Sequence, residues 1–282
     1  MSLRNFVPTV WSAKLFQELD KAHVLVPLCN RDYEGEISGY GDSVKINAVG
    51  DVTVNNYVPN VTEITPQQLD AQQTILLIDQ AKYFAFSIDD VDDAQSKPKV
   101  MGEAMRKSAY ALADTADRLI AGFYSDAGLS VASTGITRAN CLSILAEINR
   151  KMDEANVPMQ GRWAAIPAWF HQFLVVQNVI TARNVAGNEA YNRGYVGQAL
   201  GFDLYLSNNL TTQTVANTDG KAHYGIAGTS RAISFAEQIV KMEAYRPQNS
   251  FSDAVKGLHV YGSKVIDPNA LVSLSLVSTE EL

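Results

Sequence analysis

Four aspartates in one short stretch form a dense group of possible metal ligands. Asp89, Asp90, Asp92 and Asp93 offer the hard carboxylate oxygens that calcium and magnesium prefer. The stretch lacks the glycine and the downstream glutamate that complete a calcium-binding loop. The spacing therefore favours a solvated acidic turn, which would place negative charge at the start of the helix predicted to follow it.

Two glycine-rich stretches, residues 194–201 and 225–230, have a superficial similarity to phosphate-binding loops. Neither has the Lys-Ser/Thr ending of such a loop or the full dinucleotide-binding spacing. The histidines show no paired spacing on a helix, and the chain contains no Gly-x-Ser-x-Gly nucleophile turn. We therefore expect no catalytic residue, no cofactor and no metal site, which favours a structural role. The four histidines are His23, His171, His223 and His259.

The composition is that of a globular protein, with 46% apolar and 19% charged residues. The first residues lack the apolar core of a signal peptide, and no apolar run approaches the roughly 18 residues of a membrane span. We therefore expect a protein that is made and folded in a cytosol. Cys29 and Cys141 lie far apart and in no metal or redox spacing, so both are expected to be reduced thiols.

The acidic charge is concentrated in one segment of the chain. Residues 34–93 contain 11 acidic and 2 basic side chains, a net charge of −9, whereas the whole chain carries −7. The following segment, residues 94–183, carries +3 from 10 basic and 7 acidic side chains. Because phosphate binding needs clustered lysine and arginine, we expect the chain to be a poor sequence-independent binder of nucleic acid.

Two β-type runs lie within this acidic segment. Alternating Val44, Ile46 and Ala48 predict a half-buried strand, which Val52 and Val54 would continue. Residues 74–88 predict one strand, longer than the usual five or six residues. The simplest geometry is an extended antiparallel hairpin whose tip, residues 57–66, is a loop with two prolines. A tip of that length usually contacts a partner or is mobile.

A long helix is predicted to follow, from near Pro98 to about Tyr124. At 1.5 Å per residue, about 28 residues would give a rod of roughly 40 Å. Its apolar residues recur at steps of three and four, which predicts one stripe along its length. The stripe consists of Met101, Met105, Ser108, Leu112, Ala116, Leu119 and Phe123.

The remaining chain alternates between helical and extended patterns, which argues for an α+β fold. A short amphipathic helix is expected at 11–23 and a second helix at 137–155, capped by Thr137 and supported by a Glu147–Lys151 pair. Pro167 is expected to open a third helix. Surface loops are expected at 181–201 and 207–220. Strands are expected at 162–166, 202–206, 223–227, 232–245, 257–266 and 270–277.

Several segments follow one another in a recognisable order, although no single motif is diagnostic. They are NRDYEG at 30–35, GDSVKI at 41–46, IDQAKYFAF at 78–86, the acidic turn with its long helix, GFDLYLSN at 201–208 and VKGLHVYG at 255–262. In this order they resemble the major capsid (coat) protein of tailed bacteriophages, which has the Hong Kong 97-type fold. The resemblance covers nearly the whole chain.

The resemblance implies a division of the chain. It predicts an N-terminal arm (about 1–34), an extended β-hairpin called the E-loop (35–90) and a peripheral domain (91–160 and 232–282) with a spine helix at about 98–125. An axial domain would occupy 161–231. Such subunits form hexamers and pentamers of an icosahedral shell around double-stranded DNA, with scaffolding and portal proteins as partners. The resemblance thus implies a virion capsid protein assembled in the host cytoplasm.

The uneven charge suggests how copies of the chain would meet. We expect the acidic hairpin to lie across basic helical residues of a neighbouring copy. The candidate interface residues are Tyr57, Val58, Pro59 and Glu63 in the hairpin, and Lys97, Lys99, Arg106, Lys107 and Arg118 at the helix. Alternative functions are the shell of a cellular nanocompartment with the same fold, a phage tail structural protein, and an enzyme with a hidden site.

Overall fold

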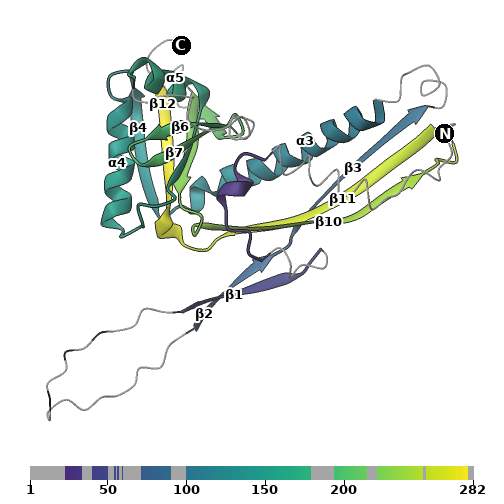
Figure 1. Ribbon diagram of the computed structural model, residues 1–282, viewed down its shortest axis with the longest axis horizontal. Coiled ribbons are helices and arrows are strands. Elements are labelled where there is room, and N and C mark those ends of the chain that lie inside the picture. Colours follow the sequence, from purple (N-terminus) through teal and green to yellow (C-terminus); the bar gives the residue numbers. More distant parts are fainter. Residues whose placement is uncertain are drawn as a thin grey trace.

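The computed structural model describes residues 23–33, 40–49, 54, 56, 59, 71–89, 100–178, 194–214, 221–249 and 252–278. Within these residues the chain has a compact end built of strands and helices, and a long extended end (Figure 1). No helix among them is long and apolar enough to cross a membrane. Residues 11–22 of the helix expected at 11–23, most of the hairpin tip and the aspartates after Asp89 lie outside the described residues.

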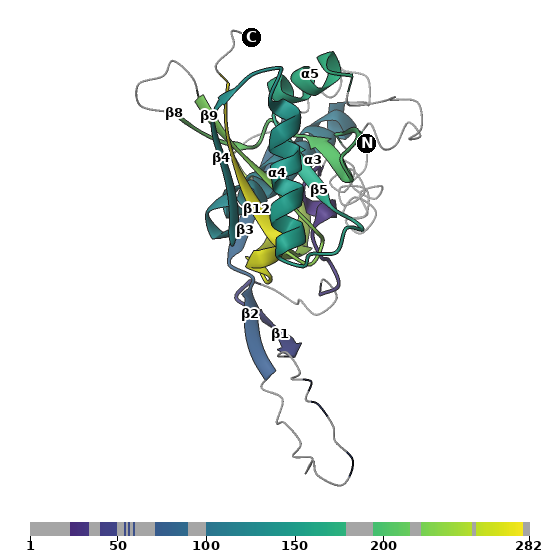
Figure 2. The ribbon, with the colours of Figure 1, turned by 90° about the vertical axis from the view of Figure 1, so that its left-hand side faces the viewer.

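The strands form three separate sheets. In the first, β1 (Ser43–Val49) pairs antiparallel with β2 (Ala71–Leu77), and this hairpin extends away from the rest of the molecule (Figure 2). The second sheet is antiparallel and has the order β10-β11-β3. Its strands are β3 (Gln80–Asp89), β10 (Ile233–Tyr245) and β11 (Ser252–Val265).

The third sheet lies at the compact end and has seven strands. Its order is β4-β12-β9-β5-β7-β6, with β8 paired to β9, and the β4–β12 and β5–β7 pairs are parallel. Its strands are β4 (Leu129–Ile136), β5 (Trp163–Ile166), β6 (Tyr195–Ala199), β7 (Phe202–Leu206), β8 (Thr211–Thr214), β9 (Lys221–Gly228) and β12 (Leu271–Ser278).

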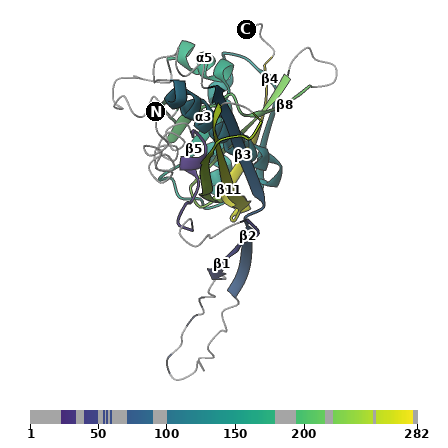
Figure 3. The ribbon, with the colours of Figure 1, turned by 90° about the vertical axis from the view of Figure 1, so that its right-hand side faces the viewer.

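The long helix α3 (Val100–Ala121) runs along the three-stranded sheet, as Figure 3 shows from the end. Its buried face packs against β10 and β11 through a small apolar cluster, with two phenylalanines of β3 at its border. The cluster consists of Met105, Ala109, Leu112, Ala113, Met242 and Val255, bordered by Phe84 and Phe86. This packing fixes the helix to the sheet and makes the extended end one layered unit.

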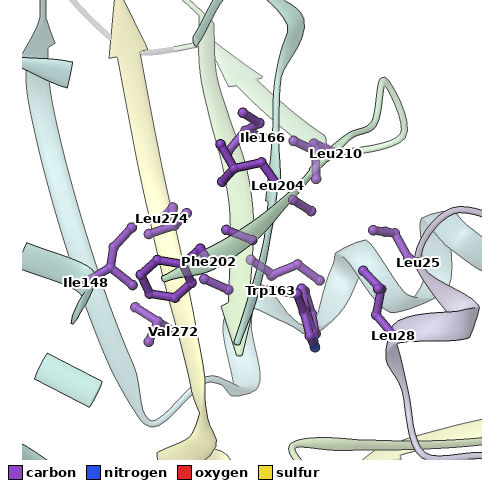
Figure 4. Close-up of a cluster of buried hydrophobic side chains, with 14 of the residues drawn as sticks. Leu25, Leu28, Ile148, Trp163, Ile166, Phe202, Leu204, Leu210, Val272 and Leu274 are labelled. Atoms are coloured by element: carbon purple, nitrogen blue, oxygen red, sulfur yellow. The ribbon is translucent and has the colours of Figure 1, made fainter. Parts of the chain in front are cut away.

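Two further helices belong to the compact end. α4 (Cys141–Glu154) lies against the seven-stranded sheet, and α5 (Ala168–Val176) follows β5 after Pro167 (Figure 2). The main core lies between α4 and the sheet, and also takes in residues that precede the hairpin. Ile148, Trp163, Phe202, Leu204, Val272 and Leu274 belong to it, together with Leu25 and Leu28 (Figure 4).

The run predicted as one strand at 74–88 is two strands in two sheets. It breaks at Ile78 and Asp79, so β2 belongs to the hairpin and β3 pairs with β11. The predicted antiparallel hairpin itself is confirmed. The long helix is also shorter than predicted, with 22 residues or about 33 Å. It ends where Gly122, a poor helix former, opens a 3-10 turn, η4 (Gly122–Asp126).

Other local predictions also differ from the structure. The strand β4 was missed, because its sequence is rich in serine and threonine rather than in large apolar residues. Strands β6 and β8 lie in two segments expected to be loops. Helix α4 begins at Cys141, with Asn140 instead of Thr137 at the cap position, and Glu147 pairs with Arg150 instead of Lys151.

Candidate assembly surfaces

Alternating burial divides the hairpin into two faces. Val44, Ile46 and Leu76 are buried against residues of β10 and β11. On the opposite face Ile75 is 41% exposed and Leu77 is 57% exposed. An isolated two-stranded sheet is marginally stable in water, so the packing of its base on the body stabilises it. The outward apolar face therefore remains available to another molecule.

The predicted residues of the hairpin tip are largely outside the described part of the chain. Pro59 is described and is exposed in a turn, whereas Tyr57, Val58 and Glu63 are not described. Val54, which was predicted to continue the first strand of the hairpin, is 92% exposed. Both described positions are therefore accessible to a contact with another molecule.

The predicted basic residues of α3 lie on its outer side. Lys107 is exposed, and so are Arg106 and Arg118. Arg106 forms an ion pair of 2.7 Å with Glu103, and Arg118 forms one of 2.9 Å with Asp114. These partners offset part of the positive charge that the sequence suggested. Lys97 and Lys99 lie outside the described residues.

A buried group of charged side chains joins the start of the described chain to α3 and β10. Asp117 of α3 accepts hydrogen bonds from the backbone N–H groups of Val24, Leu25 and Val26, at 2.9, 3.1 and 3.3 Å. The last of these residues begins a short 3-10 helix, η2 (Val26–Leu28). Asp117 therefore supplies the acceptor that the first N–H groups of a helix lack.

The second carboxylate of this group is Glu237 of β10. Its Oε2 lies 3.0 Å from Nε2 of His259 and 3.5 Å from Nε2 of His23, and Arg31 donates to its Oε1 at 3.0 Å. His23 Nδ1 in turn lies 3.7 Å from Asp117 Oδ1. Both carboxylates and both histidines are buried. The group thus places two acidic side chains beside one arginine and two titratable rings.

The surroundings shift the pKa values of this group in opposite directions. Burial alone would lower the pKa of His23, but Asp117 and Glu237 raise it to about 9. Burial alone would raise the pKa of Glu237, but His23 and His259 lower it to about 2. Near neutral pH, His23 is therefore charged beside the charged carboxylate of Glu237, as a buried ion pair requires.

Residues 23–30, called the strap below, also pair with β10. The backbone N–H of Asn30 donates to Ile233 O at 2.8 Å, and that of Phe235 donates to Asn30 O at 2.9 Å. Because Leu25 and Leu28 belong to the main core, the strap connects the seven-stranded sheet, α3 and the three-stranded sheet. It fixes the two ends of the molecule to one another.

A second polar group secures α4 to the seven-stranded sheet. The guanidinium of Arg162 is buried and donates to Val157 O at 2.6 Å, Pro158 O at 3.0 Å and Asp153 Oδ1 at 2.7 Å. It therefore satisfies carbonyl groups just beyond the end of α4. Within the described residues, no group of His, Cys, Asp or Glu is arranged to hold a metal ion.

Sequence patterns gave no signal for either polar group. Asp117 lies beside the predicted apolar stripe of the helix, where an acidic residue is normally assigned to the solvent side. The one available hint is that Asp117 sits between Ala116 and Ile120, within the arc that also contains Ala113. Glu237 and His259 come from strands paired in space, and no local spacing connects them.

The chain is similar to known proteins over most of its length. The family model of the phage capsid protein matches residues 71–274. A chain from Mycobacterium phage Che8 is 31% identical, and the alignment covers 89% of this chain and 90% of that chain with a TM-score of 0.69. No curated protein sequence matches the chain.

Two more distant structures share the fold. A chain from the capsid of cyanophage P-SCSP1u is 20% identical, with a TM-score of 0.66 over 93% of this chain and 88% of that chain. A virus-like particle from Pyrococcus furiosus is 10% identical, with a TM-score of 0.57 over 95% of this chain and 98% of that chain. At these identities the likeness concerns the fold alone.

Proposed function

Because the chain belongs to the phage capsid protein family, we propose that its copies assemble as hexamers and pentamers into the icosahedral shell of a tailed-phage virion. The observation that carries this function is the family match over residues 71–274, together with 31% identity to a chain of Mycobacterium phage Che8. The role is structural, as the sequence predicted. The shell encloses the viral genome.

The fold alone does not decide between a phage capsid and the nanocompartment alternative, because a virus-like particle from Pyrococcus furiosus also aligns with nearly the whole chain. That likeness is 10% identical, whereas the family match is specific to phage capsid proteins. Phage capsid function is therefore favoured over a cellular compartment. We also propose that the shell assembles in the host cytoplasm, that scaffolding and portal proteins are its partners, and that it encloses double-stranded DNA.

The pairing of strands supports a revised division into domains. Strands β4 and β12 come from the segments 91–160 and 232–282 expected to form the peripheral domain, yet both pair within the seven-stranded sheet. We therefore assign residues 129–231 and 271–278 to the axial domain. The peripheral domain then consists of α3 with β3, β10 and β11, and the hairpin β1–β2 is the E-loop.

We also propose that the hairpin makes the contact between copies. Its support is the exposed apolar face at Ile75 and Leu77, and the net charge of −9 on residues 34–93. The apolar face would be buried on a neighbouring copy, and the acidic charge would guide its approach to basic residues such as Lys107. Repeated contacts of this kind add up across a shell, so no single interface has to be tight.

Electron microscopy of the purified protein tests the function directly. The expected result is closed shells of one or a few discrete diameters, with or without an added scaffolding protein. Open tubes would instead support the tail-protein alternative. A protein that stays monomeric at every salt concentration tried, even with a scaffold, would count against the proposal.

A further inference from the structure

One row of residues on β11 meets the base of the hairpin. Val260, Gly262 and Lys264 are two residues apart, so their side-chain positions lie on the same face of the strand. Val260 is fully buried in an apolar cluster that includes Leu76 and Ile78 of the hairpin base. We call these three β11 residues the arm seat.

The middle residue of the arm seat has no room for a side chain. A Cβ atom on Gly262 would lie 2.2 Å from the carbonyl oxygen of Leu77 and 3.0 Å from Cα of Ile78. Both neighbours are backbone atoms, so a side-chain rotation cannot relieve the crowding. Glycine is therefore required by the close approach of the two backbones rather than by a turn.

The crossing over Gly262 coincides with the break in the predicted long strand. The ladder between β11 and β3 ends at the pair Tyr261 and Gln80. The next residue of β11 is Gly262, and there Leu77 and Ile78 pass over its face. The segment before β3 thus leaves the three-stranded sheet at the point where it contacts the arm seat.

The third residue of the arm seat holds the hairpin from its side. Lys264 Nζ donates to the carbonyl oxygen of Ile75 at 3.1 Å, across a sequence separation of 189 residues. Because the hairpin sheet has two strands, the edge of β2 that faces away from β1 presents backbone groups, and Ile75 O is the one that Lys264 reaches. The backbone of Ile78 is also fixed, because its N–H donates to Asp42 O at 2.9 Å.

A small displacement at this base is magnified along the hairpin. Relief of the clash from a Cβ on Gly262 needs a shift of about 1 Å, from 2.2 Å to the 3.4 Å of ordinary contact. A seven-residue strand such as β2 spans roughly 23 Å, so a tilt at its base moves its far end by more than the initial shift.

We propose that the arm seat sets the angle at which the hairpin leaves the body, and that this angle determines the diameter of the assembled shell. The inference rests on the shell-forming function proposed above. Val260 packs under the hairpin base. Gly262 provides the gap without a side chain, called the notch below, and Lys264 donates the hydrogen bond from the side, called the lateral hold below. These are positioning residues: they act on a neighbouring copy only through the direction of the hairpin.

The notch is tested by the substitution Gly262→Ala, with Gly257→Ala as the matched control. Gly257 lies on the same strand, and a Cβ there would meet the ring of Phe84 at 2.4 Å instead of the hairpin. Gly262→Ala should give particles that mostly differ from the wild type in diameter, or open sheets. Gly257→Ala should keep the wild-type diameter. Wild-type shells from Gly262→Ala would overturn the proposal.

The lateral hold is tested by Lys264→Met and Lys264→Arg. The arginine variant keeps a donor that reaches Ile75 O and should restore the wild-type diameter, whereas the methionine variant should broaden the diameter distribution. Lys256→Met is the control, because Lys256 lies on the same face of β11 but pairs with Glu243 at 2.8 Å. The same broadening in all three lysine variants would contradict a specific role for Lys264.

A distance measurement separates failure of this inference from failure of the proposed function. Spin labels on Lys45→Cys in β1 and Lys107→Cys in α3 report the hairpin angle in unassembled protein, and the native Cys29 and Cys141 are buried. Gly262→Ala and Lys264→Met should shift or broaden the label distance, while Gly257→Ala should not. Unchanged distances would refute the arm seat whether or not shells form.

If Gly262→Ala fails to fold, the lysine variants decide the inference by the same distance measurement. Conversely, changed distances in a protein that never forms shells would retain the arm seat as a determinant of the hairpin angle. Its link to shell diameter would then be refuted together with the proposed function.

Discussion

Asp117 and Glu237 place two carboxylates inside the junction between the two ends of the molecule. Both carboxylates are buried, and each has several donors or cations within reach. Desolvated charges are tolerated only when such partners are present, and removing one partner leaves a buried charge uncompensated. Single substitutions in this group should therefore be far more harmful than substitutions at exposed ion pairs.

The pKa values of this group predict how its contribution to stability depends on pH. The contribution of His23, whose pKa is raised to about 9, is fully present below pH 6.5 and is lost as the pH rises through about 9. That of Glu237, whose pKa is lowered to about 2, is present above pH 4.5 and is lost as the pH falls through about 2. The group should contribute most between about pH 4.5 and 6.5.

Denaturant titrations of the unassembled protein check this prediction. Glu237→Gln should lower the free energy of unfolding near pH 5.5 by roughly 3–5 kcal/mol, as for other buried ion pairs that lose one partner. The loss should shrink at pH 10, where His23 is neutral. Glu147→Gln, at an exposed pair with Arg150, is the control and should have little effect. Equal losses for Glu237→Gln at both pH values would refute a charged His23 as the partner of Glu237.

At the scale of secondary-structure elements, local patterns predicted helices better than strand ends. The apolar steps along α3 and the proline before α5 act within a few residues, so the sequence alone reveals them. The break at Ile78 lies beside Gly262, which is 184 positions away in the sequence and becomes a neighbour only in the folded chain. Likewise, no local pattern marks Asp117 as buried, because the backbone groups that it accepts from lie in the strap, more than 90 residues earlier.

The outer face of α3 tests whether charge guides assembly. Reversal of Arg106 and Lys107 to glutamate should slow shell formation by roughly tenfold at low salt, because steering by complementary charge is lost. The difference from the wild type should shrink at 1 M salt, where the Debye length is about 3 Å. Light scattering at several salt concentrations measures both effects.

The control for this experiment is an equal reversal elsewhere. Arg150→Glu with Arg231→Glu changes the net charge by the same amount, and both arginines are exposed and ion-paired within the chain. If the control slows assembly as much as the α3 reversal, net charge rather than a specific surface governs the rate. Wild-type kinetics for the α3 variant at every salt concentration would refute the electrostatic contact.

At the scale of the whole molecule, the fold separates what stabilises one copy from what joins copies. The main core, the strap and the layer of α3 on the three-stranded sheet lie within the body. The hairpin meets the body chiefly through one apolar cluster at its base. A chain organised in this way should keep its fold without the hairpin and lose its ability to form shells.

Deletion of the hairpin tests this separation. Asp42 and Ile78 are joined by a backbone hydrogen bond of 2.9 Å, so a short glycine-serine linker can replace residues 43–77 without displacing either end. The shortened protein should remain folded by circular dichroism, with a lower melting temperature because the cluster around Val260 loses Val44, Ile46 and Leu76. It should form no shells under conditions in which the wild type assembles.

A second deletion controls for shortening the chain. Thr214 of β8 pairs with Lys221 of β9, so a two-residue Asn-Gly turn can replace residues 215–220. This variant should still form shells, because the compact end keeps its sheet and the hairpin is intact. Closed shells from the protein without its hairpin would show that contacts of the body alone drive assembly, and would remove the hairpin from the proposed interface.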